Sequence, residues 1–354
     1  MRGLTAPKHE DLTMSIANGA RRALGAGVRL SIAAATLSGC VRTAAVAFDA
    51  SGPALTIHRP ALYPETIEYD SERDTFLVGS FREGAIYAVD RQGKAKILVN
   101  DERLCSVLGI AVDVERGRLW AVSSDLASSL KPSVAGPKHH AAVGVYDLAT
   151  GKPVDYVDLA SLSPGPHLLN GIALDAAGNA YVTDSFSPNI YKVSASGDAS
   201  LFLTDTRFAG EGINLNGLVV HPDGYLLVIK KSDGVLFKVP LASPATFTKV
   251  ELGAPLIGGD GVLLAGENSL VIVANQVPGN ASNAAFALTS DDGWATARVR
   301  ATHSLGDVYP TTAVLRSGTL YVIHSKLNEL IQSPAEQKSQ LQVEATIRVI
   351  GKVL

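Results

Sequence analysis

The stretch that decides the fold is residues 170–205, which read NGIALDAAGNAYVTDSFSPNIYKVSASGDASLFLTD. It contains four short apolar runs, which begin at Ile172, Ala180, Ile190 and Ser200. The first two runs are separated by Asp175-Ala-Ala-Gly178, a sequence typical of a β-turn. Runs this short, bounded by turn residues, favour strands over helices. The stretch therefore predicts four consecutive strands, the unit of a propeller blade.

The opening phrase of this stretch recurs along the chain, each time before an apolar run, a turn and a second apolar run. The copies are Pro64-Glu65-Thr66-Ile67, Leu108-Gly109-Ile110, Asn170-Gly171-Ile172, Asn216-Gly217-Leu218, Asp260-Gly261-Val262 and Thr311-Thr312-Ala313. We call one residue of each copy its opener: Glu65, Leu108, Asn170, Asn216, Asp260 and Thr311. Successive copies lie between 43 residues (Thr66 to Gly109) and 62 residues (Gly109 to Gly171) apart. This period predicts an all-β, six-bladed β-propeller.

The ends of the repeat region are also strand-like. Residues 54–58 and 345–350 are apolar runs. Because an open ring would leave unpaired strand edges at its seam, we expect these two segments to pair and close the propeller. The expected domain covers residues 51–354.

The composition excludes some classes of protein. The chain has 354 residues, 46% of them hydrophobic and 18% charged, which is enough for a large core. Its net charge of -3 argues against a nucleic-acid partner, which requires a basic surface. The only two cysteines, Cys40 and Cys105, exclude a disulfide framework. Motifs of serine hydrolases, zinc proteases and nucleotide enzymes are absent from the sequence.

Residues 1–50 have the features of an export leader and linker. Three arginines (Arg21, Arg22 and Arg29) precede an apolar run at 30–39, and Cys40 follows. This pattern is typical of a secretory signal, and the run is too short to span a bilayer. Leu37-Ser-Gly-Cys40 also resembles a lipobox, in which the cysteine is lipidated. We expect an exported protein, either periplasmic or anchored to a membrane through a lipid at Cys40; the alternative is an unstructured tail with a chance apolar run.

Four openers carry oxygen ligands. Arranged in a ring, Glu65, Asn170, Asn216 and Asp260 converge on one end of the central channel, which we call the top. Oxygen-only ligands with two carboxylates suit a divalent cation, Ca²⁺ before Mg²⁺ or Mn²⁺. Zn²⁺ is less suited, because it prefers histidine or cysteine. The alternative interpretation is that Asn-Gly and Asp-Gly are simple turn dipeptides.

The ends of the second strands predict an outer ring of polar residues around the openers. Its candidate substrate-contacting or supporting residues are Asp184, Lys230, Asn275 and His324, and His167 precedes the first asparagine opener. A long segment in the second blade, residues 126–140, is the candidate lid over the pocket.

The order Glu65, Asn170, Asn216, Asp260 at the strand openers resembles the senescence marker protein/gluconolactonase (regucalcin-like) family of six-bladed propellers. The resemblance spans roughly residues 60–350. It implies that these four residues hold a divalent cation and that Asp260 is the base for hydrolysing lactones. That family typically has an arginine two residues before the first asparagine, where this chain has Leu168. The site is therefore more apolar than a sugar lactone favours, which leaves a hydrophobic lactone, an ester or a phosphotriester.

Together these patterns predict a monomeric, Ca²⁺-dependent hydrolase of lactone or related ester bonds in a small-molecule substrate. The metal would polarise the carbonyl group and Asp260 would activate water. The alternative is a non-catalytic exported propeller that binds a ligand or a protein and contains a structural metal.

Overall fold

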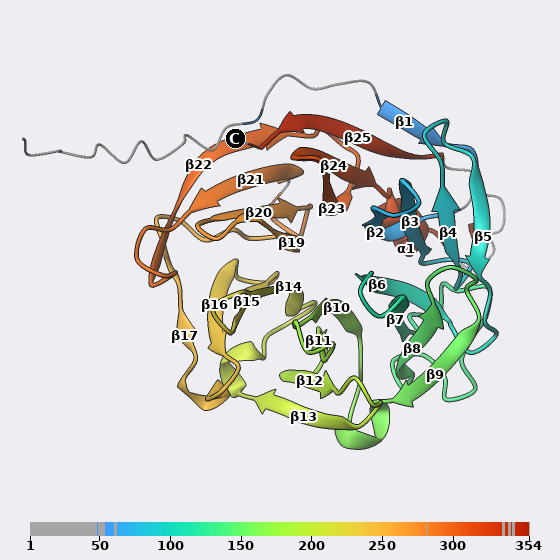
Figure 1. Ribbon diagram of the computed structural model, residues 1–354, viewed down its shortest axis with the longest axis horizontal. Helices are drawn as coiled ribbons and strands as arrows, with labels where there is room; N and C mark the ends of the chain where they lie inside the picture. Colours follow the sequence, from blue (N-terminus) through green and yellow to red (C-terminus); the bar gives the residue numbers. More distant parts are fainter. Residues whose placement is uncertain are drawn as a thin grey trace, which may run out of the picture. The chain divides into compact units, whose positions relative to one another are not determined.

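A computed structural model describes residues 48, 54–59, 62–280, 282–334, 337–338, 341 and 344–353. They belong to a compact unit, Ala44–Leu354. Six sheets are arranged in a ring around a central channel, each with its first strand innermost (Figure 1). This confirms the six-bladed propeller. The leader and Cys40 lie outside the described residues, and no helix among those residues is long and apolar enough to cross a membrane.

The first three blades are built from consecutive strands. Blade 1 contains β2 (Pro64–Asp70), β3 (Thr75–Ser80), β4 (Ile86–Val89) and β5 (Ala95–Val99). Blade 2 contains β6 (Ser106–Asp113), β7 (Arg118–Ser124), β8 (Ala141–Asp147) and β9 (Pro153–Asp158). Blade 3 contains β10 (Leu169–Leu174), β11 (Ala180–Asp184), β12 (Asn189–Val193) and β13 (Ala199–Thr204).

The last three blades vary this plan. Blade 4 contains β14 (Leu215–His221), β15 (Tyr225–Lys230), β16 (Val235–Pro240) and β17 (Thr248–Lys249). Blade 5 contains β19 (Gly259–Gly266), β20 (Ser269–Ala274), β21 (Ala284–Thr289) and β22 (Thr296–Ser304), with β18 (Glu251–Leu252) added at its outer edge. Blade 6 contains β23 (Pro310–Arg316), β24 (Thr319–His324), β25 (Ala345–Lys352) and, outermost, β1 (Ala54–Ile57).

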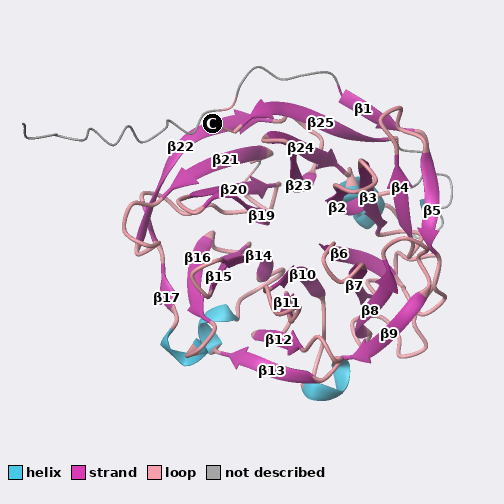
Figure 2. Ribbon diagram, in the orientation of Figure 1, coloured by secondary structure: helices cyan, strands magenta, loops and turns pink. Residues whose placement is uncertain are grey.

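Helices are few and short, as Figure 2 shows. Short 3₁₀ turns connect strands at Ala160–Leu162, Thr206–Phe208 and Pro244–Thr246. The α-helix α1 (Leu327–Gln332) lies between β24 and β25.

The core lies between the blades. Six apolar clusters each combine side chains of two neighbouring sheets, including one between blades 6 and 1. This arrangement explains the apolar first and second strands, because both of their faces are covered by adjacent sheets. The ring is therefore held by a continuous belt of apolar contacts rather than by a single central core.

The seam is closed as the sequence predicts. β1 pairs antiparallel with β25, and Ile57 lies opposite Ala345. Ile57 is fully buried in the cluster between blades 6 and 1. The last blade thus takes its outer strand from the other end of the described chain.

Every first strand contains an irregularity at its opener. The pairing with the second strand shifts at Glu65, Leu108, Asn170, Asn216, Asp260 and Thr311. A β-bulge redirects a side chain out of the regular alternation, which explains how polar residues can occupy an otherwise apolar strand. The interpretation of Asn-Gly and Asp-Gly as turn dipeptides is wrong, because all three pairs lie inside strands.

The glycine after an opener has a different purpose: it lets adjacent first strands approach closely. A Cβ atom on Gly171 would lie 2.6 Å from the carbonyl oxygen of Asn216 in the next blade. A Cβ atom on Gly217 would collide with the carbonyl oxygen of Asp260. The narrow channel therefore requires glycine at these positions.

Candidate functional site

The first strands surround a narrow channel beneath the openers. Its cavity of about 60 Å³ is lined by all six first strands and by one charged side chain, Glu68. Burial raises the pKa of Glu68 to about 7. A cavity of this size holds about two water molecules, so the channel is too narrow for a larger molecule.

The best-defined part of the site joins Asp260 to two residues that follow second strands. Lys231 Nζ lies 2.6 Å from Asp260 Oδ2, and Asn275 Nδ2 donates to the same oxygen at 2.7 Å. Lys231 also donates to Asn275 Oδ1. All three side chains are buried, and Lys231 is only 3% exposed. The Asp260 carboxylate thus accepts two hydrogen bonds on Oδ2. No described side chain donates to its other oxygen, Oδ1.

Glu65 lies in the electrostatic field of this group. Burial and then the negative charge of Asp260 raise the pKa of Glu65 well above its usual range, although Lys231 opposes both. Burial opposes the charged form of Lys231, but the charge and hydrogen bond of Asp260, together with the charges of Tyr309 and Glu65, outweigh it and raise the pKa of the lysine. The site therefore contains two acids in unlike environments: Asp260 is paired with a cation, whereas the raised pKa of Glu65 favours its protonated form. Such a difference suits one carboxyl group to act as a base and the other as an acid.

The two asparagine openers complete the inner ring. Asn170 Nδ2 donates to Ser185 Oγ at 3.2 Å, and Ser185 Oγ in turn donates to the carbonyl oxygen of Leu215. Asn216 is 2% exposed. Their strands lie side by side at the channel wall, as the close approach of Gly171 to the Asn216 carbonyl oxygen indicates. The four predicted openers are thus brought to one end of the channel.

Lys231 is the residue that sequence reasoning missed. The prediction placed Lys230 in the outer ring, but its ammonium donates to the carbonyl oxygens of Arg207 and Ala209 and pairs with Asp233. The sequence contains a signal that identifies the correct lysine. Ser185, Lys231 and Asn275 each follow the opener of their blade by 15 residues (170 and 185, 216 and 231, 260 and 275).

Asp184 and His167 have a supporting role. His167 Nδ1 lies 2.8 Å from Asp184 Oδ2, and Asp184 Oδ1 accepts hydrogen bonds from the backbone amides of Leu168, Phe186 and Ser187. The bond to Asp184 raises the pKa of His167. This buried pair fixes the backbone that leads into Asn170.

His324 lies at the end of β24 and forms no hydrogen bond with Asp260. Its Nε2 atom is buried without a hydrogen-bond partner among the described residues. Burial and the charge of Arg348 lower the pKa of His324 to about 4. The imidazole is therefore neutral at physiological pH.

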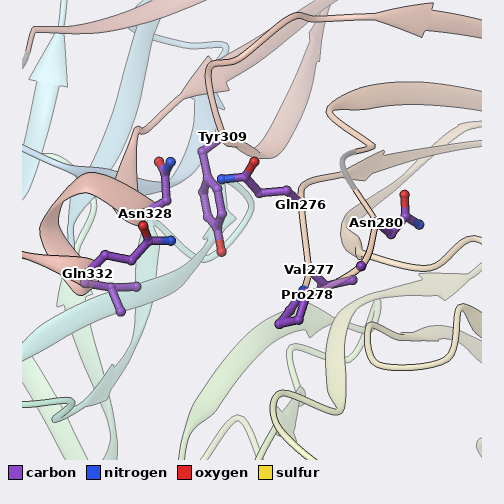
Figure 3. Close-up of a pocket in the computed structure, with 9 residues that line it drawn as sticks. Gln276, Val277, Pro278, Asn280, Tyr309, Asn328 and Gln332 are labelled. Carbon is purple, nitrogen blue, oxygen red and sulfur yellow. The ribbon is translucent and has the colours of Figure 1, made fainter.

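An open pocket adjoins the buried group. Its cavity of about 510 Å³ is lined by Gln276, Val277, Pro278, Gly279, Asn280, Tyr309, Asn328, Ile331 and Gln332. In Figure 3 the Tyr309 ring stands between Asn328 of α1 and Gln276. The same ring lies 5.7 Å from Lys231 Nζ, so Tyr309 separates the pocket from the buried charges. None of the lining residues is charged, which favours a neutral ligand.

Apolar side chains cover the remainder of the channel mouth. We call Tyr63, Phe81, Leu108, Leu168, Leu327 and Leu330 the mouth cluster, and Tyr309 packs against it. Tyr63 and Tyr309 both precede a proline at the start of a first strand, and both have left-handed backbones with φ of 43° and 47°. Such strain in non-glycine residues is concentrated at functional sites.

The predicted lid at 126–140 is fastened to blade 1. The Leu130 amide donates to the Arg82 carbonyl oxygen, and Lys131 Nζ bonds to the carbonyl oxygens of Gly84 and Asp101. These bonds use the lysine that could otherwise attract a substrate. Helix α1, which the sequence did not predict, contributes both to the mouth cluster and to the pocket.

The donor set fits a divalent cation only in part. Glu65 Oε2 is buried without a hydrogen-bond partner among the described residues, which suits a metal ligand. Asp260, however, already binds an ammonium group, and a divalent ion there would face a full positive charge. As the residues lie, they do not fit such an ion.

Comparisons with known proteins bear on the fold. No protein-family model and no curated protein sequence matches the chain. Among solved structures, the major allergen Mala s 1 of Malassezia sympodialis is 18% identical, with a TM-score of 0.67 over 84% of this chain and 96% of that one. Regucalcin from Agrobacterium tumefaciens, a calcium-binding protein, is 14% identical, with a TM-score of 0.58 over 87% and 96%.

The luciferin-regenerating enzyme is also 14% identical, with a TM-score of 0.56 over 85% of this chain and 98% of that one. Sequence identities this low establish similarity of fold only, so the chemistry must be argued from the residues of the site. The chain is thus a six-bladed β-propeller similar in structure to regucalcin and to luciferin-regenerating enzyme, as the order of its openers predicts.

Proposed function

We propose that the protein hydrolyses an ester or lactone bond in a small, uncharged and largely apolar molecule. The observation that carries the proposal is the buried Asp260–Lys231 pair beside Glu65, which only the Tyr309 ring separates from an uncharged pocket. A base, a cation and a protonated acid within one buried group are the components that acyl transfer to water requires.

In the proposed reaction, Asp260 Oδ1 takes a proton from water while the water oxygen attacks the substrate carbonyl carbon. The ammonium of Lys231 stabilises the negative charge that develops on the carbonyl oxygen. The C–O bond to the leaving alcohol then breaks, and Glu65 gives the alcohol oxygen its proton. The two carboxyl groups exchange the remaining proton with water, which restores the starting state.

The pocket supports the choice of substrate. Amide side chains and Tyr309 supply polar contacts without charge, and the mouth cluster supplies apolar ones. A sugar lactone carries many hydroxyl groups, which these apolar walls would leave without partners. We therefore propose a hydrophobic lactone or ester.

The sequence alone suggests a second version of this mechanism, in which Glu65, Asn170, Asn216 and Asp260 hold Ca²⁺. Bound there, the ion would polarise the carbonyl group. The presence of Lys231 favours the mechanism without Ca²⁺, and treatment with a chelator distinguishes the two mechanisms. A chelator should leave the rate unchanged if the lysine acts, and should abolish it if Ca²⁺ acts.

The test is a panel of aryl esters and of lactones with alkyl chains of increasing length. We expect turnover by the wild type that rises with apolar chain length, and a loss of about 10²–10⁴-fold in kcat/KM for Asp260→Asn. The matched control is Asp223→Asn, an exposed aspartate in the β14–β15 turn, which should retain full activity. A folded wild type that turns over no member of the panel would instead support the non-catalytic binding propeller.

A further inference from the structure

Lys231 occupies a position that is equivalent in blades 3, 4 and 5. It follows the end of β15 as Ser185 follows β11 and Asn275 follows β20. These positions lie beside the openers, so their side chains meet the inner ring. Among the three, only blade 4 places a charge there. This charge is positive, as the charge of a bound metal ion would be.

The contacts of the ammonium are those of an ion bound between ligands. Lys231 Nζ lies 2.6 Å from Asp260 Oδ2 and is hydrogen-bonded to Asn275 Oδ1. The Tyr309 ring lies beyond it, 5.7 Å from Nζ to the ring centre. An ammonium has three N–H donors, and these two oxygens take two of them. The third has no partner among the described residues.

The ammonium and a divalent ion would compete for the same carboxylate. Ca²⁺ binds carboxylate oxygens at about 2.3–2.6 Å, so an ion on Asp260 Oδ2 would lie within about 5 Å of the lysine nitrogen. Two cations at that distance repel each other strongly where water is excluded. The lysine side chain is only 3% exposed, so its charge is held inside the protein beside Asp260.

We propose that Lys231 takes the place of a divalent cation, so that a covalently attached ammonium supplies the positive charge of the central site. This inference deepens the proposed function and rests on it for the role of the charge in acyl transfer. It can be tested by metal binding alone, which requires no substrate.

The experiment titrates CaCl₂ into the full chain, after treatment with EDTA, by isothermal calorimetry and by thermal unfolding. The wild type should show no saturable binding and no change in Tm. Lys231→Met, which keeps the length of the side chain and removes its charge, should acquire one Ca²⁺ site. At a Ca²⁺ concentration of about 100 times Kd, its Tm should rise by about 5 °C.

Two further variants locate the acquired site. Lys231→Met combined with Glu65→Gln should lose the binding again, because only one carboxylate remains. Lys230→Met is the matched control: this neighbouring lysine is equally buried, but it pairs with Asp233 outside the ring. It should remain as indifferent to Ca²⁺ as the wild type.

Each outcome of this experiment supports or overturns the inference. Saturable Ca²⁺ binding by the wild type that disappears in Glu65→Gln would overturn the inference, because the ion would then coexist with the lysine. A folded Lys231→Met protein that ignores Ca²⁺ would overturn it as well, because the lysine would not be what keeps the ion out. If Lys231→Met does not fold, Lys231→Gln retains a hydrogen bond to Asp260 and takes its place. Failure of the substrate panel would leave these binding results untouched.

Discussion

At the scale of single residues, Asn275 connects more of the site than any charged group does. Its amide nitrogen donates to Asp260 and, at 2.9 Å, to the carbonyl oxygen of Pro310, while its carbonyl oxygen accepts from Lys231. Pro310 begins the first strand of blade 6, whereas Asp260 lies in that of blade 5. One side chain thus orients the proposed base and fixes two blades relative to each other.

The buried pair of His167 and Asp184 makes stability depend on pH. The bond to Asp184 raises the pKa of His167 above its value in the unfolded chain. The stabilisation is therefore fully present below a pH of about 6.5 and is lost as the pH rises through the folded-state pKa. We expect His167→Gln, which cannot titrate, to be about 2 kcal/mol less stable than the wild type at pH 6. The difference should shrink by pH 9, as measured by urea unfolding.

The control for this prediction is His58→Gln, an exposed histidine at the end of β1. Its stability should follow that of the wild type throughout the pH range. A wild-type advantage over His167→Gln that stays constant or grows with pH would contradict the ion-pair explanation.

The sequence predicted which residues form most of the site but not where every side chain lies. The four oxygen-bearing openers were predictable because a repeated position in a ring must converge on its axis. Lys231 was missed because adjacent residues at a strand end face opposite directions. Choosing between Lys230 and Lys231 requires the register, which shifts at Asn216 in the partner strand, and the 15-residue spacing from the opener is the trace of that register in the sequence.

At the scale of elements, the first strands combine a bulge with a close approach to the next blade. The bulge turns the opener toward the axis, and the following glycine allows contact with the neighbouring strand. Each feature needs the other, because a side chain at the glycine position would widen the channel and separate the openers.

Gly217→Ala tests this coupling. The added methyl group would collide with the Asp260 carbonyl oxygen and push β14 away from β19. We expect a loss of about 1–3 kcal/mol in the free energy of unfolding, measured in urea, together with weaker activity through displacement of Asp260.

Gly266→Ala in β19 is the matched control, since its nearest neighbour would be Ser269 Cβ at 3.9 Å. That variant should be as stable as the wild type. An equal loss in both variants would mean that lost backbone freedom, and not the collision, is responsible.

Helix α1 shows where prediction of elements from sequence ends. Its six residues, Leu327–Gln332, are too few for a helical period to stand out. Its stability comes from Leu327 and Leu330 packing on Tyr63 and Leu168, which are remote in sequence. The pocket wall that α1 forms therefore could not be predicted from the sequence. The longer segment at 126–140 was predicted to be the lid instead.

At the scale of the whole molecule, stability depends on closure of the ring. Four residue pairs join β1 to β25, and Ile57 and Leu55 fill the cluster between blades 6 and 1. The closing strands were predictable, because a ring of sheets leaves one seam and the chain offers strand-like segments at both ends of the repeats.

Removal of residues 1–57 should open this seam. The variant loses the buried Ile57 side chain, worth about 1.5–3 kcal/mol, as well as the pairing along β25. We expect a fall in Tm of about 10 °C by differential scanning calorimetry, and aggregation through the exposed edge.

Removal of residues 1–43, which lie outside the compact unit, is the control and should leave the Tm unchanged. A truncation at residue 57 that unfolds like the wild type would show that blade 6 is stable with three strands.

The pairing of Ile57 with Ala345 also has a consequence for biosynthesis. On the ribosome, β1 is made almost 290 residues before its partner, which at about 5–20 residues per second is a delay of roughly 15–60 s. During translation the first five blades have all their strands, whereas the segment that completes the sixth must wait unpaired. The nascent chain is therefore most open to chaperones, and to transport machinery that requires an unfolded client, until its last strand is made.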